Sequence, residues 1–176
     1  MENHMTLIKS KRFILRPYRV GDKESLIRNI NERDIYKYTA RIPYPYRLKD
    51  ARDWINNCLN SGKRKNKNSI NFAIDINGKV VGGIGFDPIE EHKAEIGYWL
   101  GKKYWKFGIM TKAVKLVTNF GLNKLKLKRI FAYVFPKNAA SARVLEKNGY
   151  EFEGLLRKHH IKYGRYIDAK LYAKIK

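Results

Sequence analysis

The chain has 176 residues and a formal net charge of +22, from 38 lysines and arginines against 16 aspartates and glutamates. This length suits one domain, which we expect to span residues 1–176. A single cysteine, Cys58, excludes an internal disulfide, and the 4 histidines do not stand at metal-ligand spacings. No segment approaches the ~18 apolar residues of a membrane helix, and the N-terminus carries no apolar leader. We therefore expect a cytoplasmic protein that binds no metal.

The first half of the chain reads as a strand, two helices and a hairpin. Asp22 is a candidate N-cap for the first helix. Asn77 and Gly78 supply the positive φ angles of a type I′ turn, so the segments on either side predict a hairpin. SGKRKNKN (61–68) reads as an exposed loop. In chain order we expect a strand over 12–18, helices over 22–31 and 48–60, and strands over 71–76 and 79–86.

The second half alternates strands with helices. Met110, Ala113, Val114 and Val117 recur at helical spacing and form one apolar stripe. The last two segments alternate cleanly, which predicts a hairpin around Gly164. We expect strands over 94–101 and 129–136, helices over 107–121 and 138–149, and closing strands over 154–163 and 166–175. This order predicts an α/β (mixed α+β) domain with one central sheet.

The excess of basic residues favours acidic or phosphate-rich partners, such as nucleic acid, a ribosome-like surface, an acidic protein or a phosphorylated small molecule. AT-rich codon usage would also raise the lysine content. The charge is unevenly placed, however, because residues 96–143 contain no aspartate or glutamate. Local function explains this acid-free block better than codon usage alone.

The order of elements and three local motifs resemble the GNAT acetyl-CoA-dependent N-acetyltransferases, and within them the Rim-type branch that acetylates protein N-termini. The most specific motif is PKNAASARVLEKNGYEFEG (136–154); AEIGYWL followed by YWKFGIMTKAV is the second, and LRPY (15–18) is the third. The resemblance implies a single domain with a mostly antiparallel, twisted central sheet, flanked by helices and splayed near its middle. It also implies acetyl-CoA as co-substrate and a primary amine as acceptor.

KKYWKFGIMTKAVKLV (102–117) joins a turn to a helix. A helix N-terminus presents unpaired backbone N–H groups and partial positive charge, which favour a phosphate. The resemblance places the diphosphate of acetyl-CoA here. We expect contacts from Lys103, Lys106 and the backbone amides of Phe107, Gly108, Ile109, Met110 and Thr111, with the Met110 side chain in the core.

Two lysines in this stretch depart from the family pattern. Lys106 stands where the family usually has a glycine, and Lys112 replaces a usual acidic residue. The lysines either strengthen phosphate binding or mark a weakened site. A non-glycine residue can keep the turn provided that its φ stays negative.

Acetyl transfer to an amine needs a neutral nucleophile, a polarised thioester carbonyl and a stabilised leaving thiolate. Glu95 is our candidate for the base, acting through water; its alternative role is a strand-edge carboxylate paired with a lysine. The resemblance implies that a backbone N–H near Tyr98, Trp99 or Leu100 binds the thioester oxygen. The side chains of Tyr98 and Trp99 otherwise read as core or cleft aromatics.

The helix over 138–149 supplies the remaining candidates. Asn138 reads as its N-cap, and the resemblance implies a further hydrogen bond to the pantetheine arm. Ser141 resembles the serine near the cofactor sulfur, and Arg143 either reaches the adenosine 3′-phosphate or is solvated. Leu145 occupies the position of a tyrosine acid found in many family members, so a tyrosine mechanism is not expected unless Tyr150 substitutes.

The acceptor is expected to be a protein α-amine, such as that of a ribosomal protein. A strongly basic chain repels polyamines and aminoglycosides at long range. The acceptor cleft should lie between the early helices and the last hairpin, with YTARIPYPYR (38–47) as either a substrate loop or a plain connection. Acetylation of a small-molecule amine, a non-catalytic acetyl-CoA-binding module and an RNA-binding protein are the alternatives; the chain is expected to be a monomer or homodimer without a membrane partner.

Overall fold

The computed structural model describes residues 7–61 and 68–176, so most of the expected loop at 61–68 lies outside the described residues. None of the helices in the described part of the chain is long and apolar enough to cross a membrane. The first elements are β1 (Ile8–Lys9), β2 (Ile14–Arg16), η1 (Val20–Asp22), α1 (Lys23–Ile30), α2 (Arg33–Tyr38), α3 (Leu48–Ser61), β3 (Ile70–Ile76) and β4 (Lys79–Glu90). The chain continues through β5 (Lys93–Leu100), η2 (Lys102–Tyr104), α4 (Ile109–Asn123), β6 (Arg129–Val134), α5 (Ala139–Glu146), β7 (Glu151–Lys162) and β8 (Arg165–Ile175).

The strands form one eight-stranded sheet in the order β1-β2-β3-β4-β5-β6-β8-β7. Every neighbouring pair is antiparallel except β5 and β6, which run parallel. The expected mixed α/β architecture is therefore confirmed. The predicted hairpin around Asn77 and Gly78 is also confirmed, with φ angles of 53° and 77° in the turn.

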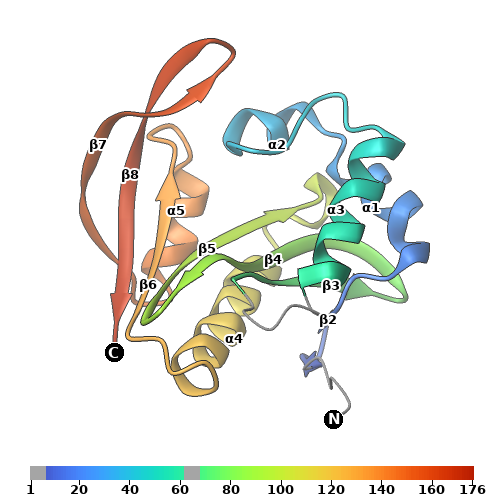
Figure 1. Ribbon diagram of the computed structural model, residues 1–176, viewed down its shortest axis with the longest axis horizontal. Helices are drawn as coiled ribbons and strands as arrows, with labels where there is room; N and C mark the ends of the chain where they lie inside the picture. The colour runs from blue at the N-terminus through green and yellow to red at the C-terminus, as the bar shows by residue number, and fades with distance from the viewer. Residues whose placement is uncertain (1–6, 62–67) are drawn as a thin grey trace.

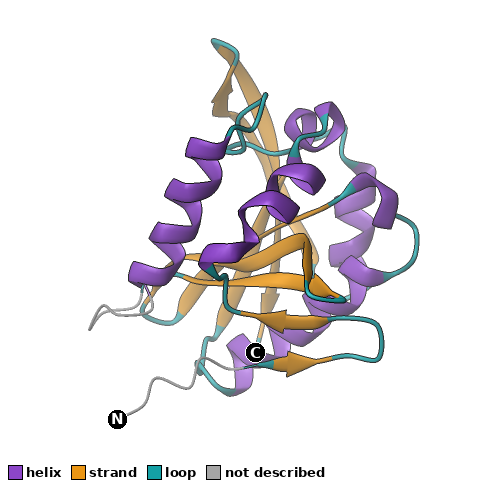
Figure 2. Cartoon of the chain, turned by 90° about the vertical axis from the view of Figure 1, so that its right-hand side faces the viewer, coloured by secondary structure: helices purple, strands orange, loops and turns teal. Residues whose placement is uncertain are grey.

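Helices cover both faces of the sheet (Figure 2), and each face has its own apolar core. The apolar stripe of α4 packs on one face, together with Ala142 and Leu145 of α5. On the other face, Leu26 of α1 and Ile55 of α3 pack with Trp99 of β5. Because side chains alternate along a strand, neighbouring residues of β5 face different layers of the molecule.

The parallel strands β5 and β6 separate soon after they begin (Figure 1). Their pairing covers Lys93, Ala94 and Glu95 of β5 and ends there, although β5 continues to Leu100. Over the same length β5 stays paired with β4 on its other side. The expected splay in the middle of the sheet is thus present, and it begins beside Glu95.

Strand β1 and helix α2 were missed. Strand β1 has 2 residues and α2 has 6, which is too short for a periodic signal. Asp22 stands at the N-cap position of α1, as expected, but its carboxylate does not cap the helix. It accepts hydrogen bonds from the Arg16 guanidinium and from the Arg19 amide, because a buried arginine is the stronger partner for a carboxylate.

Candidate active site

The splay leaves part of the β5 backbone facing an open gap. The Gly101 amide donates to the Val81 carbonyl across the β4–β5 ladder at 2.8 Å. Amides alternate in direction along an antiparallel ladder, so those of Tyr98 and Leu100 point away from β4, toward β6. Of the three amides expected to serve the thioester oxygen, these two face the gap.

Hydroxyl groups of β5 and α5 meet on the α4–α5 face of the gap. The Tyr98 hydroxyl lies 2.8 Å from Ser141 Oγ, and burial raises the pKa of Tyr98. The Ser141 amide donates to Asn138 Oδ1 at 3.1 Å, which confirms Asn138 as the N-cap of α5. Tyr98 and the cap therefore fix Ser141 from two sides, a role for the Tyr98 side chain that the sequence did not reveal.

The turn before α4 contains two residues with positive φ. Gly108 has a φ of 73° and Lys106 a φ of 67°. Lys106 does not meet the condition of a negative φ, because the chain keeps the left-handed conformation that a glycine would adopt there. In this turn Lys106 and Phe107 are exposed, and α4 begins at Ile109 without a side-chain cap.

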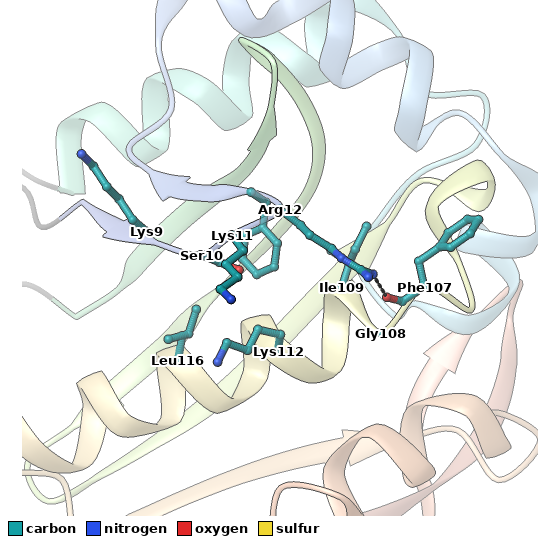
Figure 3. Close-up of a pocket in the computed structure, with 10 residues that line it drawn as sticks. Lys9, Ser10, Lys11, Arg12, Phe107, Gly108, Ile109, Lys112 and Leu116 are labelled. Atoms are coloured by element: carbon teal, nitrogen blue, oxygen red, sulfur yellow. Dashed lines mark hydrogen bonds between the residues drawn. The ribbon is translucent and has the colours of Figure 1, made fainter.

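Arg12 holds this turn from the side of the β1–β2 hairpin (Figure 3). Its guanidinium donates to the Phe107 carbonyl at 3.0 Å, a contact that joins residues far apart in the chain. Beside it lies a cavity of about 440 Å³ between β1–β2 and α4, into which Lys11 and Lys112 extend. Lys112 thus lies on the flank of α4 away from α5, and Arg12 is a site residue that the sequence did not reveal.

The first turn of α4 fits a diphosphate group. Its amides have no side-chain acceptor, and unpaired N–H groups at a helix N-terminus bind phosphate. Ile109 and Met110 are buried, which confirms core packing for the Met110 side chain, whereas Thr111 is half-buried. Lys103 is exposed and its ammonium lies 5.1 Å from the Tyr104 ring centroid, and Arg143 is exposed on α5.

The positive φ of Lys106 gives a first testable prediction. A non-glycine residue in this conformation costs about 1–2 kcal/mol. A glycine removes this cost, but part of the gain is lost because glycine also gives the unfolded chain more conformational freedom. We expect Lys106→Gly to raise the free energy of unfolding by up to about 1 kcal/mol, measured by urea denaturation. Lys103→Gly is the matched control, because Lys103 lacks a positive φ; it should lower stability, and equal effects of the two changes would contradict the account.

Glu95 faces the opposite side of the gap from Ser141. Its side chain is 20% exposed, and its carboxylate lies 3.7 Å from the guanidinium of Arg41, which also lies 3.8 Å from Asp87. Burial raises the pKa of Glu95, Arg41 lowers it and Asp87 raises it. The partner of this carboxylate is therefore an arginine of the 38–47 loop, not the lysine considered as an alternative, and that loop reaches the candidate base.

Gly97 leaves a hollow beside Glu95. By strand alternation Glu95, Gly97 and Trp99 share the face that carries α1, α2 and α3. Trp99 is buried in the core of that face, but Gly97 is exposed and a Cβ added to it would meet no atom within 4 Å. An interior glycine in a strand often marks the close approach of a ligand, a signal that could have been read from the sequence.

This hollow gives a second prediction. Gly97→Ala and Gly97→Val add side chains without a clash of the new Cβ, and valine suits a strand. We expect unchanged or higher stability, with acetyl transfer falling roughly tenfold or more for valine because reacting groups must approach within ~3–3.5 Å. Steady-state kinetics and thermal unfolding on the same samples test this; full activity of Gly97→Val would place the reaction elsewhere.

Leu145, at the position of the tyrosine acid of many family members, and Tyr150, considered as its substitute, both lie inside the core. Leu145 is fully buried. Tyr150 is buried as well, and its hydroxyl lies 2.7 Å from Thr118 Oγ1. Burial raises the pKa of Tyr150, so the hydroxyl stays protonated inside the core. The hydroxyl groups of Tyr98 and Ser141, by contrast, contact each other between β5 and α5.

Comparison with known proteins matches residues 12–151 to a family model described as Acetyltransferase (GNAT) domain. An uncharacterized N-acetyltransferase, p20 of Bacillus licheniformis, is 29% identical over 98% of this chain and 97% of its own length. The probable N-acetyltransferase YjcK of Bacillus subtilis is 31% identical, over 87% and 88%. A ribosomal-protein-serine acetyltransferase of Escherichia coli is 31% identical, over 59% of each chain.

Solved structures share the fold over nearly the whole chain. A GNAT-family acetyltransferase from Bacillus anthracis has a TM-score of 0.82 and 28% identity, covering 97% of this chain and 98% of its own. RimL, a ribosomal alpha-N-protein acetyltransferase in complex with coenzyme A, has a TM-score of 0.87 and 21% identity, over 97% and 98%. The self-immunity acetyltransferase MccE, in complex with acetyl-CoA and AMP, has a TM-score of 0.86 and 24% identity, over 95% and 94%.

Proposed function

This chain belongs to the GNAT acetyltransferase family, and from this premise we propose that it acetylates the N-terminal α-amine of a protein. The family membership makes it an acetyl-CoA-dependent N-acetyltransferase. One observation carries the proposal. The pairing of β5 with β6 ends at Glu95, and Tyr98, three residues further along β5, shares a hydrogen bond with Ser141 on the other face of the sheet.

Residues on the α4–α5 face would hold the co-substrate. The amides of Phe107 to Thr111 would bind the diphosphate, with Lys103 and Lys106 adding positive charge. Asn138 would bind the pantetheine arm with the part of its amide that the cap leaves free, and Arg143 would serve the 3′-phosphate. When bound, acetyl-CoA supplies an activated acetyl group as a thioester.

The residues at the gap divide the remaining chemistry. The amide of Tyr98 or Leu100 would stabilise negative charge on the thioester oxygen. The Ser141 hydroxyl, oriented by Tyr98, would stabilise the leaving thiolate. Glu95 would accept the proton of the acceptor ammonium through a water molecule. A raised pKa makes this carboxylate a stronger base than an ordinary one.

An α-amine suits this site better than a lysine side chain. An α-ammonium loses its proton near pH ~8 and a lysine near ~10.4. At neutral pH, deprotonation of an α-ammonium therefore costs less free energy. The net charge of +22 disfavours small polycations and favours acidic or ribonucleoprotein partners. Ribosomal-protein acetyltransferases among the relatives and structural neighbours support the same class of acceptor.

Peptide acetylation tests the proposal. The purified protein is incubated with acetyl-CoA and peptides that carry a free α-amine and an internal lysine, and mass spectrometry locates the acetyl group. We expect the group on the α-amine, and no transfer to the same peptides once their α-amine is blocked. Preferential modification of the lysine or of small amines would overturn the proposed acceptor.

A further inference from the structure

Lys162, at the end of β7, is a buried lysine without a role in the chemistry above. The residue is 6% exposed. Its ammonium donates to the backbone carbonyls of Tyr36 and Thr39, at the end of α2. Burial lowers the pKa of Lys162, and no described carboxylate offsets it. The ammonium of the β7–β8 hairpin is thus held by the backbone of another element.

Three aromatic rings surround this ammonium. Their centroids lie at 4.2 Å for Tyr36, 5.6 Å for Tyr163 and 5.8 Å for Phe135. Tyr36 and Tyr163 also contact each other edge-on at 4.9 Å. The faces of aromatic rings attract cations, more strongly where water is excluded. Carbonyls and rings together form a cage for the ammonium, contributed by α2, the end of β6 and the β7–β8 hairpin.

The cage lies at the far end of a row of aromatic side chains that starts near Glu95. Glu95 pairs with Phe131 of β6, and its charge acts on Tyr133, whose pKa it helps to raise. The His160 ring packs edge-on against Tyr133 at 5.8 Å and against Phe135 at 5.5 Å. The row therefore leads from the candidate base to the Lys162 cage, along the face that carries α2. Figure 1 shows α2 and the β7–β8 hairpin facing each other above this face.

Burial of the Lys162 charge needs a reason other than packing. An unpaired ammonium is costly to remove from water, whereas a methionine or leucine would fill the same space without that cost. The ammonium adds directed hydrogen bonds, because it binds two carbonyls at the end of α2. Helix α2 is short, and Ile35 is its single buried residue. The lysine thus fixes the position of α2 relative to the hairpin.

We propose that Lys162 is a positioning residue of the acceptor site: its cage clasps α2 to the β7–β8 hairpin and sets the spacing of these two elements, between which the acceptor amine would approach Glu95. This inference rests on the proposed function for its acceptor, although the clasp itself can be tested without an acceptor. It assigns Lys162 no contact with the reacting atoms.

Lys162→Met tests the clasp in two ways. Hydrogen exchange should become faster at the amides of residues 36–40 and 159–166, with or without any substrate. The KM for a peptide acceptor should rise roughly tenfold to a hundredfold, while the KM for acetyl-CoA and the melting temperature stay near those of the wild type. Lys162→Arg, which keeps a cation for the rings and carbonyls, should restore much of the acceptor affinity.

Lys158→Met is the matched control. Lys158 lies on the same strand, is exposed, and its ammonium lies over the Tyr166 ring at 5.9 Å. This variant should change neither exchange at α2 nor the acceptor KM. Unchanged exchange in Lys162→Met would overturn the clasp. Faster exchange with an unchanged acceptor KM would overturn its role in positioning. If the wild type acetylates no peptide but exchange still responds to Lys162→Met, the proposed acceptor fails and the clasp does not.

Discussion

Glu95→Gln is expected to lower kcat/KM for acetyl transfer by roughly 10²–10⁴-fold, the usual contribution of a general base. Glutamine keeps the size and shape of the side chain but cannot accept the proton of the acceptor ammonium. Binding of acetyl-CoA should be unchanged, because Glu95 lies on the face away from Ser141. Thiol release with a peptide acceptor measures the rate, and titration calorimetry measures coenzyme binding.

The same variant should be more stable than the wild type at neutral pH. Burial raises the pKa of Glu95 in the folded protein, so the folded state binds this proton more tightly than the unfolded state does. The stability contributed by the protonated group is present below the unfolded pKa of ~4.3 and is lost as pH rises through the folded pKa. Glutamine does not ionise and so avoids this loss of stability. The unfolding free energy of Glu95→Gln should therefore exceed that of the wild type near pH 7, and the difference should vanish in acid.

Asp87→Asn provides the matched control for both effects. Asp87 is a more exposed carboxylate that contacts the same Arg41. Its charge raises the pKa of Glu95, so its removal should shift the acid limb of the pH–rate profile to lower pH and leave the maximal rate largely intact. Comparable rate losses in the two variants, or a Glu95→Gln enzyme with near-normal turnover, would remove Glu95 from the mechanism.

Arg16→Met is expected to be strongly destabilising. Arg16 is 3% exposed and binds Asp75 through Nε at 2.6 Å and both oxygens of Asp22 at 2.8 Å. Without the guanidinium, two buried carboxylates lose their partner. Breaking a buried ion pair in this way costs about 3–5 kcal/mol, which for a chain of this size lowers the melting temperature by on the order of 10 °C.

A neighbouring arginine provides the control for this loss. Arg19→Met is the control, since Arg19 is an exposed neighbour in the same segment. A loss at Arg16 of less than about 1 kcal/mol, as for ordinary surface changes, would show that the buried network contributes little.

Elements with a strong local pattern could be predicted from the sequence. The apolar stripe of α4, the Asn77–Gly78 turn and the alternation of β8 each depend on residues close together in the chain. Strand β1 and helix α2 could not, because each is too short for a period and forms through contacts with distant elements. Arg16 shows the same limit. It binds the Asp22 carboxylate, which the sequence had suggested as the cap of α1.

The candidate site likewise combines residues that local motifs predict with contacts that they do not. Glu95, Asn138 and Ser141 were predicted from motifs; Glu95 lies where β5 and β6 separate, and Ser141 lies beside Tyr98 of β5. The contacts that support the site join segments far apart in the chain: Arg12 with the Phe107 carbonyl, and Lys162 with the end of α2. The conformation of Lys106 could not be predicted, because residue type favours a negative φ, whereas the chain between η2 and α4 adopts a positive one at this residue.

A crystal structure with bound coenzyme A tests the central claim most directly. The account predicts that the diphosphate lies within hydrogen-bond distance of the amides around Gly108 and that the thiol end enters the opening between β5 and β6, beside Ser141. A coenzyme bound elsewhere, or a turn in which the Lys106 side chain occupies the place of the diphosphate, would contradict the assignment of the site.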